Sequence, residues 1–99
     1  MKAIRILPGA AGDLEAAADF YESQRKGLGA DFANALSVDI DRLLIHGGVH
    51  VLHQGFHRAI SKRFPFAIYY LLDEEIVSIY AVLDCRRDPD TANAILKSR

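Results

Sequence analysis

The sequence predicts an α+β fold, in which a helical hairpin packs on one face of a small, mostly antiparallel sheet. Three observations support this prediction. An apolar strand opens the chain, two stretches with helical periodicity follow it, and three strands are then collected between Phe56 and Cys85. The predicted order is therefore strand, helix, helix, strand, strand, strand and a short final helix, an order typical of α+β domains.

The first half of the chain contains the opening strand and the hairpin. Lys2–Leu7 alternates and is rich in Ile and Leu, and Pro8-Gly9 ends it. The first helix is expected from about Ala11 to Arg25, and the second from about Ala30 to His46. Gly27-Leu28-Gly29 separates them, so they should form an antiparallel pair. Each helix has an apolar face at helical spacing: Leu14, Ala17, Ala18 and Tyr21 on the first, and Phe32, Leu36, Ile40, Leu43 and Leu44 on the second.

The second half is predicted to form most of the sheet. Val49–Gln54 is expected to be a loop, and Phe56–Arg63 a strand. Phe64-Pro65 marks a turn, because proline cannot donate a hydrogen bond within a sheet. Phe66–Leu72 is strongly apolar and should be a central strand. Asp73-Glu74-Glu75 makes the next turn, Ile76–Cys85 is the last strand, and a short helix is expected over Thr91–Lys97.

Alternation along the last strand predicts its two faces. Val77, Ile79, Ala81, Leu83 and Cys85 should point toward the hairpin, so Cys85 is expected to be a buried apolar residue, not a nucleophile. The opposite face, with Tyr80, Asp84 and Arg86, should be solvated and functional.

Length and composition indicate one soluble domain spanning residues 1–99. A chain of 99 residues, 51% hydrophobic and 25% charged, is long enough for one core. No apolar run reaches the roughly 18 residues of a membrane span, and the first residues lack the apolar core of a secretory signal. The single Cys85 cannot form an internal disulfide. We therefore expect a cytoplasmic protein without membrane association.

Charge is distributed unevenly although the net charge is only −1. Acidic residues dominate from Asp13 to Asp41, whereas no Asp or Glu occurs between Arg42 and Leu72. That second stretch contains Arg42, Arg58, Lys62 and Arg63, together with all 4 histidines. The asymmetry predicts an acidic surface on one side of the molecule and a cationic functional surface on the other. A chance distribution of surface charges is the alternative.

Three stretches resemble a known family: DLEAAADFYESQRKGLGADF, LHQGFHRAISKRFPFAIYY and IVSIYAVLDCRRDP. In this order they are similar to toxins of bacterial type II toxin–antitoxin modules, in the RelE/ParE superfamily. The helix–GLG–helix break, the Gly-x-x-Arg before RFPFAIYY and the closing AVLxCRRDP most resemble the ParE-like, plasmid-stabilisation branch. The resemblance covers nearly the whole chain, and the ordered set carries it, because no single motif is specific.

The resemblance implies a toxin that an antitoxin neutralises. ParE-like relatives inhibit DNA gyrase and growth, which would make the basic residues a target-binding set: Arg58, Lys62, Arg63, Arg86 and Arg87. Relatives of the RelE type are instead ribosome-dependent mRNA endoribonucleases. In that alternative Arg58, Arg63 and Arg86 would hold phosphate, and His57 or Asp84 would move protons.

Departures from the pattern favour the gyrase interpretation. Asp84 replaces a histidine that many relatives carry, and His57-Arg58 replaces a frequent arginine pair. The tail Asp90–Arg99 contains neither the Tyr nor the His that the nucleases use near this end. A third interpretation, an inactive member that only binds a partner, also stays open.

Other interpretations compete at several of these residues. The arginines alternatively pair with nearby acids, as Arg86 with Asp84 and Arg87 with Asp88. The histidines at 46, 50, 53 and 57 have helical spacing, but glycines interrupt any such helix, so we expect no metal site. Tyr69, Tyr70 and Tyr80 are expected to pack across strands more than to stack on bases. No P-loop or dinucleotide motif is present, and we expect no cofactor.

Partner binding is a separate expectation. The apolar hairpin and the sheet edge offer a groove in which an antitoxin tail would add a strand or place a helix. The resemblance is compatible with a homodimer or with a toxin–antitoxin heterotetramer, and the sequence does not decide between them.

Overall fold

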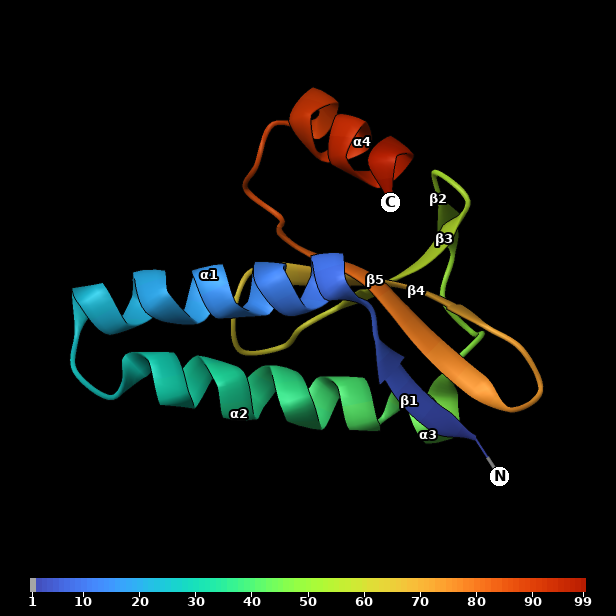
Figure 1. The fold of residues 1–99 in the computed structure, drawn as a ribbon, viewed down its shortest axis with the longest axis horizontal. Coiled ribbons are helices and arrows are strands. Elements are labelled where there is room, and N and C mark those ends of the chain that lie inside the picture. Colours follow the sequence, from blue (N-terminus) through green and yellow to red (C-terminus); the bar gives the residue numbers. More distant parts are fainter. Residues whose placement is uncertain (1) are drawn as a thin grey trace.

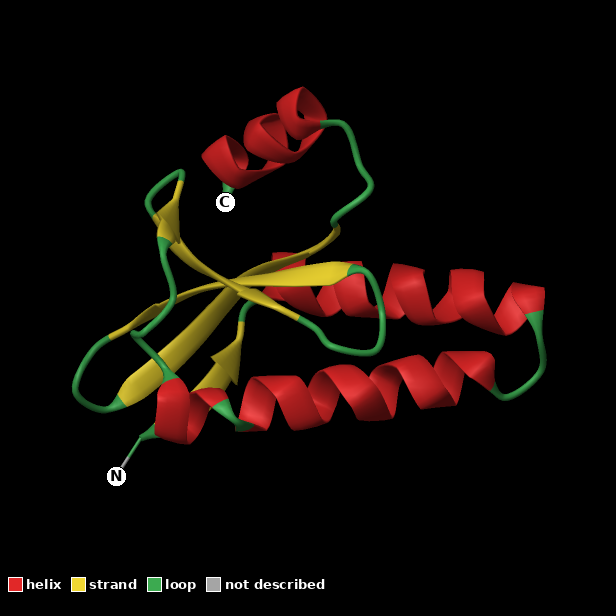
Figure 2. Ribbon diagram, turned by 180° about the vertical axis from the view of Figure 1, so that it is seen from behind, coloured by secondary structure: helices red, strands yellow, loops and turns green. Residues whose placement is uncertain are grey.

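The computed structural model describes residues 2–99 and has three layers (Figure 1). A five-stranded sheet lies between a helical hairpin on one face and a short C-terminal helix on the other, as Figure 2 also shows from behind. The elements in chain order are β1 (Ala3–Ile6), α1 (Pro8–Gln24), α2 (Leu28–Asp41), α3 (Leu43–His46), β2 (Leu52–His53), β3 (Phe56–Ile60), β4 (Phe66–Leu72), β5 (Ile76–Asp84) and α4 (Pro89–Ser98).

The sheet confirms the predicted α+β class. Its strand order is β1-β5-β4-β3-β2, so β4 is central, as its apolar sequence predicts. β1 runs parallel to β5, and every other neighbouring pair is antiparallel. Within residues 2–99, no helix has both the length and the apolar character of a membrane span.

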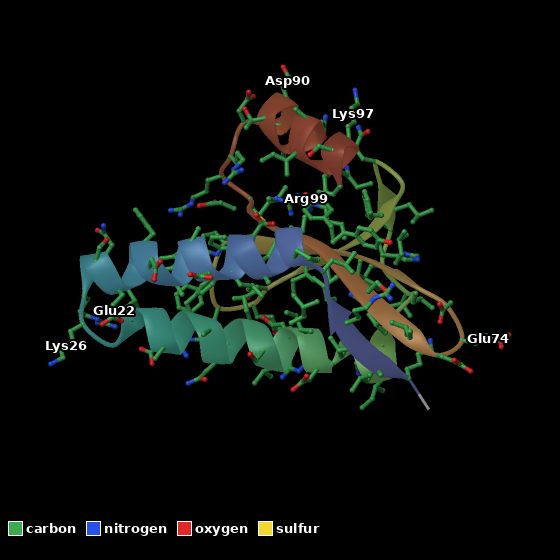
Figure 3. The ribbon with its side chains drawn as sticks, viewed as in Figure 1. Glu22, Lys26, Glu74, Asp90, Lys97 and Arg99 are labelled. Carbon is green, nitrogen blue, oxygen red and sulfur yellow. The ribbon has the colours of Figure 1, made fainter. Side chains whose placement is uncertain are left out.

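The hairpin turn is built by glycines and by one acid. Gly27 has a φ of +88°, a backbone conformation that favours glycine, and a Cβ on Gly29 would lie 2.6 Å from the Ala18 carbonyl oxygen. The Glu22 carboxylate, at the end of α1, accepts hydrogen bonds from the Gly27 and Gly29 amides at 3.0 Å. Figure 3 shows Glu22 at this turn and Lys26 pointing away from it. Glu22 thus satisfies amides that the start of α2 leaves open.

The main core lies between the hairpin and the sheet. Phe32, Leu36 and Ile40 of α2 are buried against Ile68 and Tyr70 of β4 and other sheet residues. Phe32 lies 4.9 Å from Phe66 and 5.2 Å from Tyr21 between ring centres. These contacts are the ones that the helical spacing predicts.

A β-bulge reverses the predicted faces at the end of β5. The register shifts so that Tyr70 pairs with Ile79 and Tyr69 with Ala81, which leaves Tyr80 as an extra residue. Val77 and Ile79 face the hairpin as predicted, but beyond the bulge Val82 takes that side. Ala81 and Leu83 instead pack on the opposite face against Leu96. The prediction that all five alternating residues point toward the hairpin was therefore wrong.

The same reversal corrects the prediction for Cys85. Its side chain is exposed, because β5 ends at Asp84 and the chain leaves the sheet there. Its amide still bonds to the Pro65 carbonyl oxygen at 2.7 Å. Cys85 is therefore not part of the core.

The face opposite the hairpin is covered by α4, so the prediction of a solvated face was also wrong. Leu96, with Ala92 and Ile95, packs on Ala67, Tyr69 and other residues of that face. Asp84 and Arg86, predicted on that face, instead line a hollow beside α1 on the hairpin side, because the bulge exchanges the faces of β5.

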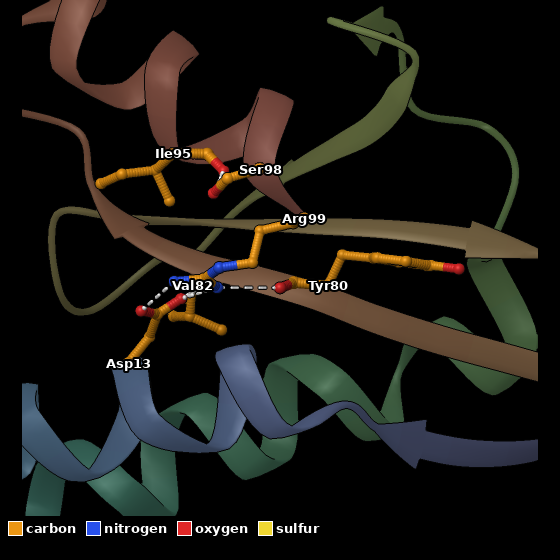
Figure 4. A network of polar contacts seen from close by, with 6 residues as sticks. All are labelled: Asp13, Tyr80, Val82, Ile95, Ser98 and Arg99. Carbon is orange, nitrogen blue, oxygen red and sulfur yellow. Dashed lines mark hydrogen bonds and ion pairs between the residues drawn. The ribbon is translucent and has the colours of Figure 1, made fainter.

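Beyond the helix, the Arg99 guanidinium forms two bonds to the Asp13 carboxylate of α1, at 2.8 and 2.9 Å, and one to the Tyr80 carbonyl oxygen at 3.0 Å (Figure 4). The Val82 amide donates to the same carboxylate at 3.0 Å. Asp13 thus joins α1, β5 and the end of α4.

Several element boundaries differ from the predicted ones. β3 ends at Ile60 rather than at Arg63, so Lys62 and Arg63 lie on the turn that leads to β4. α1 begins at Pro8 rather than near Ala11, because proline lacks only an amide hydrogen that the first helical turn does not use. The second predicted helix divides at Arg42 into α2 and α3. The expected loop at Val49–Gln54 contains β2, which pairs with the start of β3. A strand as short as β2 shows no alternating pattern in the sequence from which it could be predicted.

Candidate target-binding surface

The predicted cations occupy three places, and Arg58 is the one on the sheet itself. On β3 it points to the α4 face, where its Nε donates to the Tyr69 hydroxyl at 3.0 Å and its guanidinium lies 5.9 Å from that ring centre. Its Nη2 is 3.8 Å from Cys85 Sγ, beside the loop that follows β5. Within residues 2–99, Arg58 forms no ion pair with an acid, so its charge stays available to a ligand.

Arg86 and Arg87 follow β5 and line a hollow of about 270 Å³ beside α1. The Arg86 guanidinium donates two hydrogen bonds to the Asp84 carboxylate, from Nη2 at 2.7 Å and from Nε at 3.0 Å. This pairing is the structural alternative that the sequence suggested for Arg86. Arg87 forms no ion pair with the neighbouring Asp88. Of these two arginines, Arg87 is therefore the one with an unneutralised charge among the described residues.

Lys62 and Arg63 lie on the turn between β3 and β4. They line a hollow of about 340 Å³ together with Val38, Asp39 and other residues of α2. The Arg63 guanidinium lies 5.6 Å from the Phe64 ring centre, and Lys62 is exposed. Neither forms an ion pair within the described part of the chain.

The structure does not bring together the two groups that would move protons in a nuclease. His57 pairs with Tyr70 of β4, whereas Asp84 pairs with Phe66 of the same strand. Four residues along a strand span about 13 Å, and the two groups also come from opposite sides of β4. An acid and a base on one scissile phosphate must each be within hydrogen-bond reach.

The charge state of Asp84 also disfavours a role as a base. The hydrogen bonds from Arg86 lower the pKa of the Asp84 carboxyl, and the charges of Arg86 and Arg87 add to this effect. The same contact raises the pKa of Arg86. The pair therefore stays ionised at neutral pH, and a carboxylate of low pKa is a weak proton acceptor.

His57 belongs instead to a network around Tyr70 that sequence reasoning missed. The fully buried Tyr70 hydroxyl accepts the Gly48 amide hydrogen at 2.9 Å and contacts His50 Nδ1. His57 stacks on the Tyr70 ring, and its Nδ1 donates to the His50 carbonyl oxygen at 2.7 Å. The predicted packing role of Tyr70 is present, but no sequence pattern shows which groups its hydroxyl meets.

Burial and neighbouring histidines set the charge of His50. Burial lowers its pKa first, and the nearby His57 and His46 lower it further. A neutral His50 with an unprotonated Nδ1 accepts the Tyr70 hydroxyl hydrogen, which leaves the hydroxyl lone pairs for the Gly48 amide. In residues 2–99, no three His, Cys, Asp or Glu side chains are placed to hold a metal ion.

Comparisons with known proteins identify a similar fold. A chain of a solved structure described as the chromosomal ParDE TA system from P. aeruginosa superposes with a TM-score of 0.73. The alignment covers 83% of this chain and 94% of that chain at 17% sequence identity. A scan against protein-family models finds no match, and a search of curated proteins finds no significant sequence relative. The similarity is therefore one of fold.

Proposed function

We propose that this chain is the toxin of a type II toxin–antitoxin pair, that it inhibits DNA gyrase in the cytoplasm, and that a cognate antitoxin neutralises it. The observation that carries the proposal is the fold shared with a chain of the ParDE TA system, over 94% of that chain. The resemblance of the three ordered sequence stretches to RelE/ParE toxins supports the same proposal.

The cations support a role in binding an anionic or acidic target. Arg58, Lys62, Arg63 and Arg87 lack ion pairs within residues 2–99, so a partner does not have to displace an internal acid to reach them. Guanidinium groups bind phosphate and carboxylate oxygens with two parallel bonds. Arg86 is the exception among the predicted target-binding residues, because its guanidinium already donates two hydrogen bonds to the Asp84 carboxylate.

The separation of His57 from Asp84 supports gyrase inhibition over mRNA cleavage. Inhibition of an enzyme by docking requires a complementary surface but no proton transfer. Cleavage through the ribose 2′-hydroxyl requires an acid and a base at one phosphate, and the predicted pair occupies different parts of the sheet. The tail offers no substitute, since Asp90–Arg99 has neither Tyr nor His.

Induced expression in a bacterial host without the antitoxin tests the proposal. We expect growth arrest, together with gyrase-linked DNA breaks, and rescue when the product of the adjacent open reading frame is co-expressed. Primer extension on translated mRNA distinguishes the alternative, because an endoribonuclease would produce new 5′ ends. Normal growth with soluble, folded protein would favour an inactive, partner-binding protein.

A further inference from the structure

We propose that residues 48–54 form a strap that detaches from the sheet in acid, because a proton on His50 removes the hydrogen bond that its ring accepts from the Tyr70 hydroxyl. We call this segment the His50 strap. The inference goes beyond the proposed function and does not rest on it, because it concerns a conformational equilibrium within the chain.

His50 is the side chain that anchors the strap. Every other residue of 48–54 is exposed, whereas His50 is half-buried. Its Nδ1 contacts the hydroxyl of the fully buried Tyr70, and that hydroxyl also accepts the Gly48 amide hydrogen at 2.9 Å. The other attachments within residues 2–99 are mainly hydrogen bonds: the short pairing of β2 with β3, Arg58 amide to Val51 carbonyl, His57 Nδ1 to His50 carbonyl, and His53 Nε2 to Asn93 Oδ1. A segment with so few buried side chains opens at a low cost in free energy.

A proton on His50 removes the acceptor of the Tyr70 hydroxyl. The neutral ring accepts the hydroxyl hydrogen at Nδ1, which leaves the hydroxyl lone pairs for the Gly48 amide. A protonated ring donates from both nitrogens, so the hydroxyl hydrogen would face a second donor in a buried place. A buried polar hydrogen without an acceptor is destabilising. Movement of the strap away from the sheet relieves this conflict.

The charged groups around His50 do not compensate its proton. Four titratable or charged groups line the hollow of about 480 Å³ beside it: Asp39, Arg42, His46 and Lys62. Arg58 lines a second hollow that His50 also borders, and burial, His57 and His46 lower the pKa of His50. Asp39 is the one carboxylate among these groups in residues 2–99, but it already accepts the Ser61 hydroxyl at 2.7 Å and lies 3.9 Å from Arg42. A proton on His50 therefore gains no free anionic partner.

The other two hydrogen-bonded histidines do not act in this way, because their bonds survive protonation. His57 Nδ1 donates to the His50 carbonyl oxygen at 2.7 Å, and His53 Nε2 donates to Asn93 Oδ1 at 3.3 Å. A protonated imidazole keeps both of its donors. Among the hydrogen-bonded histidines of residues 2–99, His50 is thus the one whose side chain acts as an acceptor.

Hydrogen exchange of the wild-type chain, followed by NMR, tests the proposal when each rate is divided by the intrinsic rate at the same pH. Release breaks the bonds of the Gly48 and Arg58 amides, so their protection should fall about fivefold or more between about pH 7 and about pH 5. The fall should level off below the pH at which the His50 ring itself titrates, followed by its imidazole signals. Low urea concentrations should accelerate these two amides less than the β4 amides, because a local opening exposes little surface.

Two matched variants assign the effect to His50. His50→Gln keeps an acceptor for the Tyr70 hydroxyl but takes up no proton, so the protection of Gly48 should lose this dependence on pH. His53→Gln removes a donor histidine from the same strap and should keep the dependence. Protection of the wild-type chain that does not change with pH, or an equal fall in His50→Gln, would overturn the proposal, as would a dependence that His53→Gln abolishes.

The wild-type data decide the matter even if His50→Gln does not fold. A His50 ring that titrates while the Gly48 and Arg58 amides keep their protection would show that the ring moves without releasing the strap, which contradicts the proposal. Gly48 and Arg58 amides with the same protection and urea dependence as the β4 amides would likewise contradict it, because exchange would then require unfolding of the whole chain.

Discussion

Tyr70 shows how a single buried hydroxyl organises the region beside β2. It fixes the Gly48 amide and His50, while His57 stacks on its ring and holds the His50 carbonyl. Three of the four histidines that resemble a metal motif in sequence lie near one another, and two of them contact this tyrosine. The described contacts of His50 and His57 are hydrogen bonds and ring packing around Tyr70.

Replacing Tyr70 by phenylalanine should therefore destabilise the fold by about 1–3 kcal/mol, because the Gly48 amide and His50 lose a buried partner. The control is Tyr80→Phe, since the Tyr80 hydroxyl makes no hydrogen bond with residues 2–99 and we expect a change within about 0.5 kcal/mol. Urea unfolding measures both. Equal midpoints for the two variants would contradict this role of Tyr70.

Stability should also depend on the protonation of His50. Its pKa lies below the ordinary value of 6.5 in the folded chain, so the unfolded chain takes up the proton at higher pH. The free energy of unfolding should thus decrease as pH falls through about 6.5 and level off below the folded pKa. We expect His50→Gln to flatten this decrease between about pH 5 and 7, measured by urea unfolding in that range. An unchanged slope would show that other groups cause it.

Residue-level chemistry was only partly predictable from the sequence. The pairing of Arg86 with Asp84 was one of two stated alternatives, because residues two apart at a strand end are within reach of each other. The Asp13–Arg99 contact was not foreseen, since it joins positions 86 residues apart and leaves no local pattern. The target-binding role of Arg58, Lys62, Arg63 and Arg87 stays a prediction.

At the scale of elements, periodicity predicted the two long helices, the three main strands and the final helix. It failed at the bulge in β5, because an inserted residue exchanges the two faces without altering the alternation of apolar and polar residues. Periodicity also did not predict where α4 packs, because an amphipathic helix does not encode which apolar surface it will cover. Tertiary packing on Ala67, Tyr69 and Leu83 determines that position.

The attachment of α4 should be sensitive to Arg99. The helix contacts the sheet mainly through Leu96, Ala92 and Ile95, and the Arg99–Asp13 bonds secure its end. Arg99→Gln should raise hydrogen exchange of the α4 amides roughly five- to tenfold, as expected for loss of about 1 kcal/mol of local stability. Arg25→Gln at the hairpin turn is the matched control, and exchange of β4 should not change in either variant. Unaltered α4 exchange in Arg99→Gln would refute the anchoring role.

At the scale of the whole molecule, cations and acids lie in separate regions, but these regions do not form one cationic face opposite one acidic face. Arg58 lies on the α4 face of the sheet, Arg87 beside α1, and Lys62 and Arg63 next to α2. The expected single cationic face is therefore divided among three places around the sheet. A target that engages all of them would have to wrap around the end of the sheet at which β3 leads into the β3–β4 turn and β5 ends.

Gyrase supercoiling in the presence of purified protein tests the central proposal most directly. We expect the wild-type chain to inhibit supercoiling and to trap cleaved DNA complexes. Arg58→Gln should raise the half-inhibitory concentration by roughly tenfold or more, whereas the control Arg25→Gln should leave it unchanged. Full gyrase activity with folded wild-type protein, or equal inhibition by Arg58→Gln and the wild-type chain, would contradict the account.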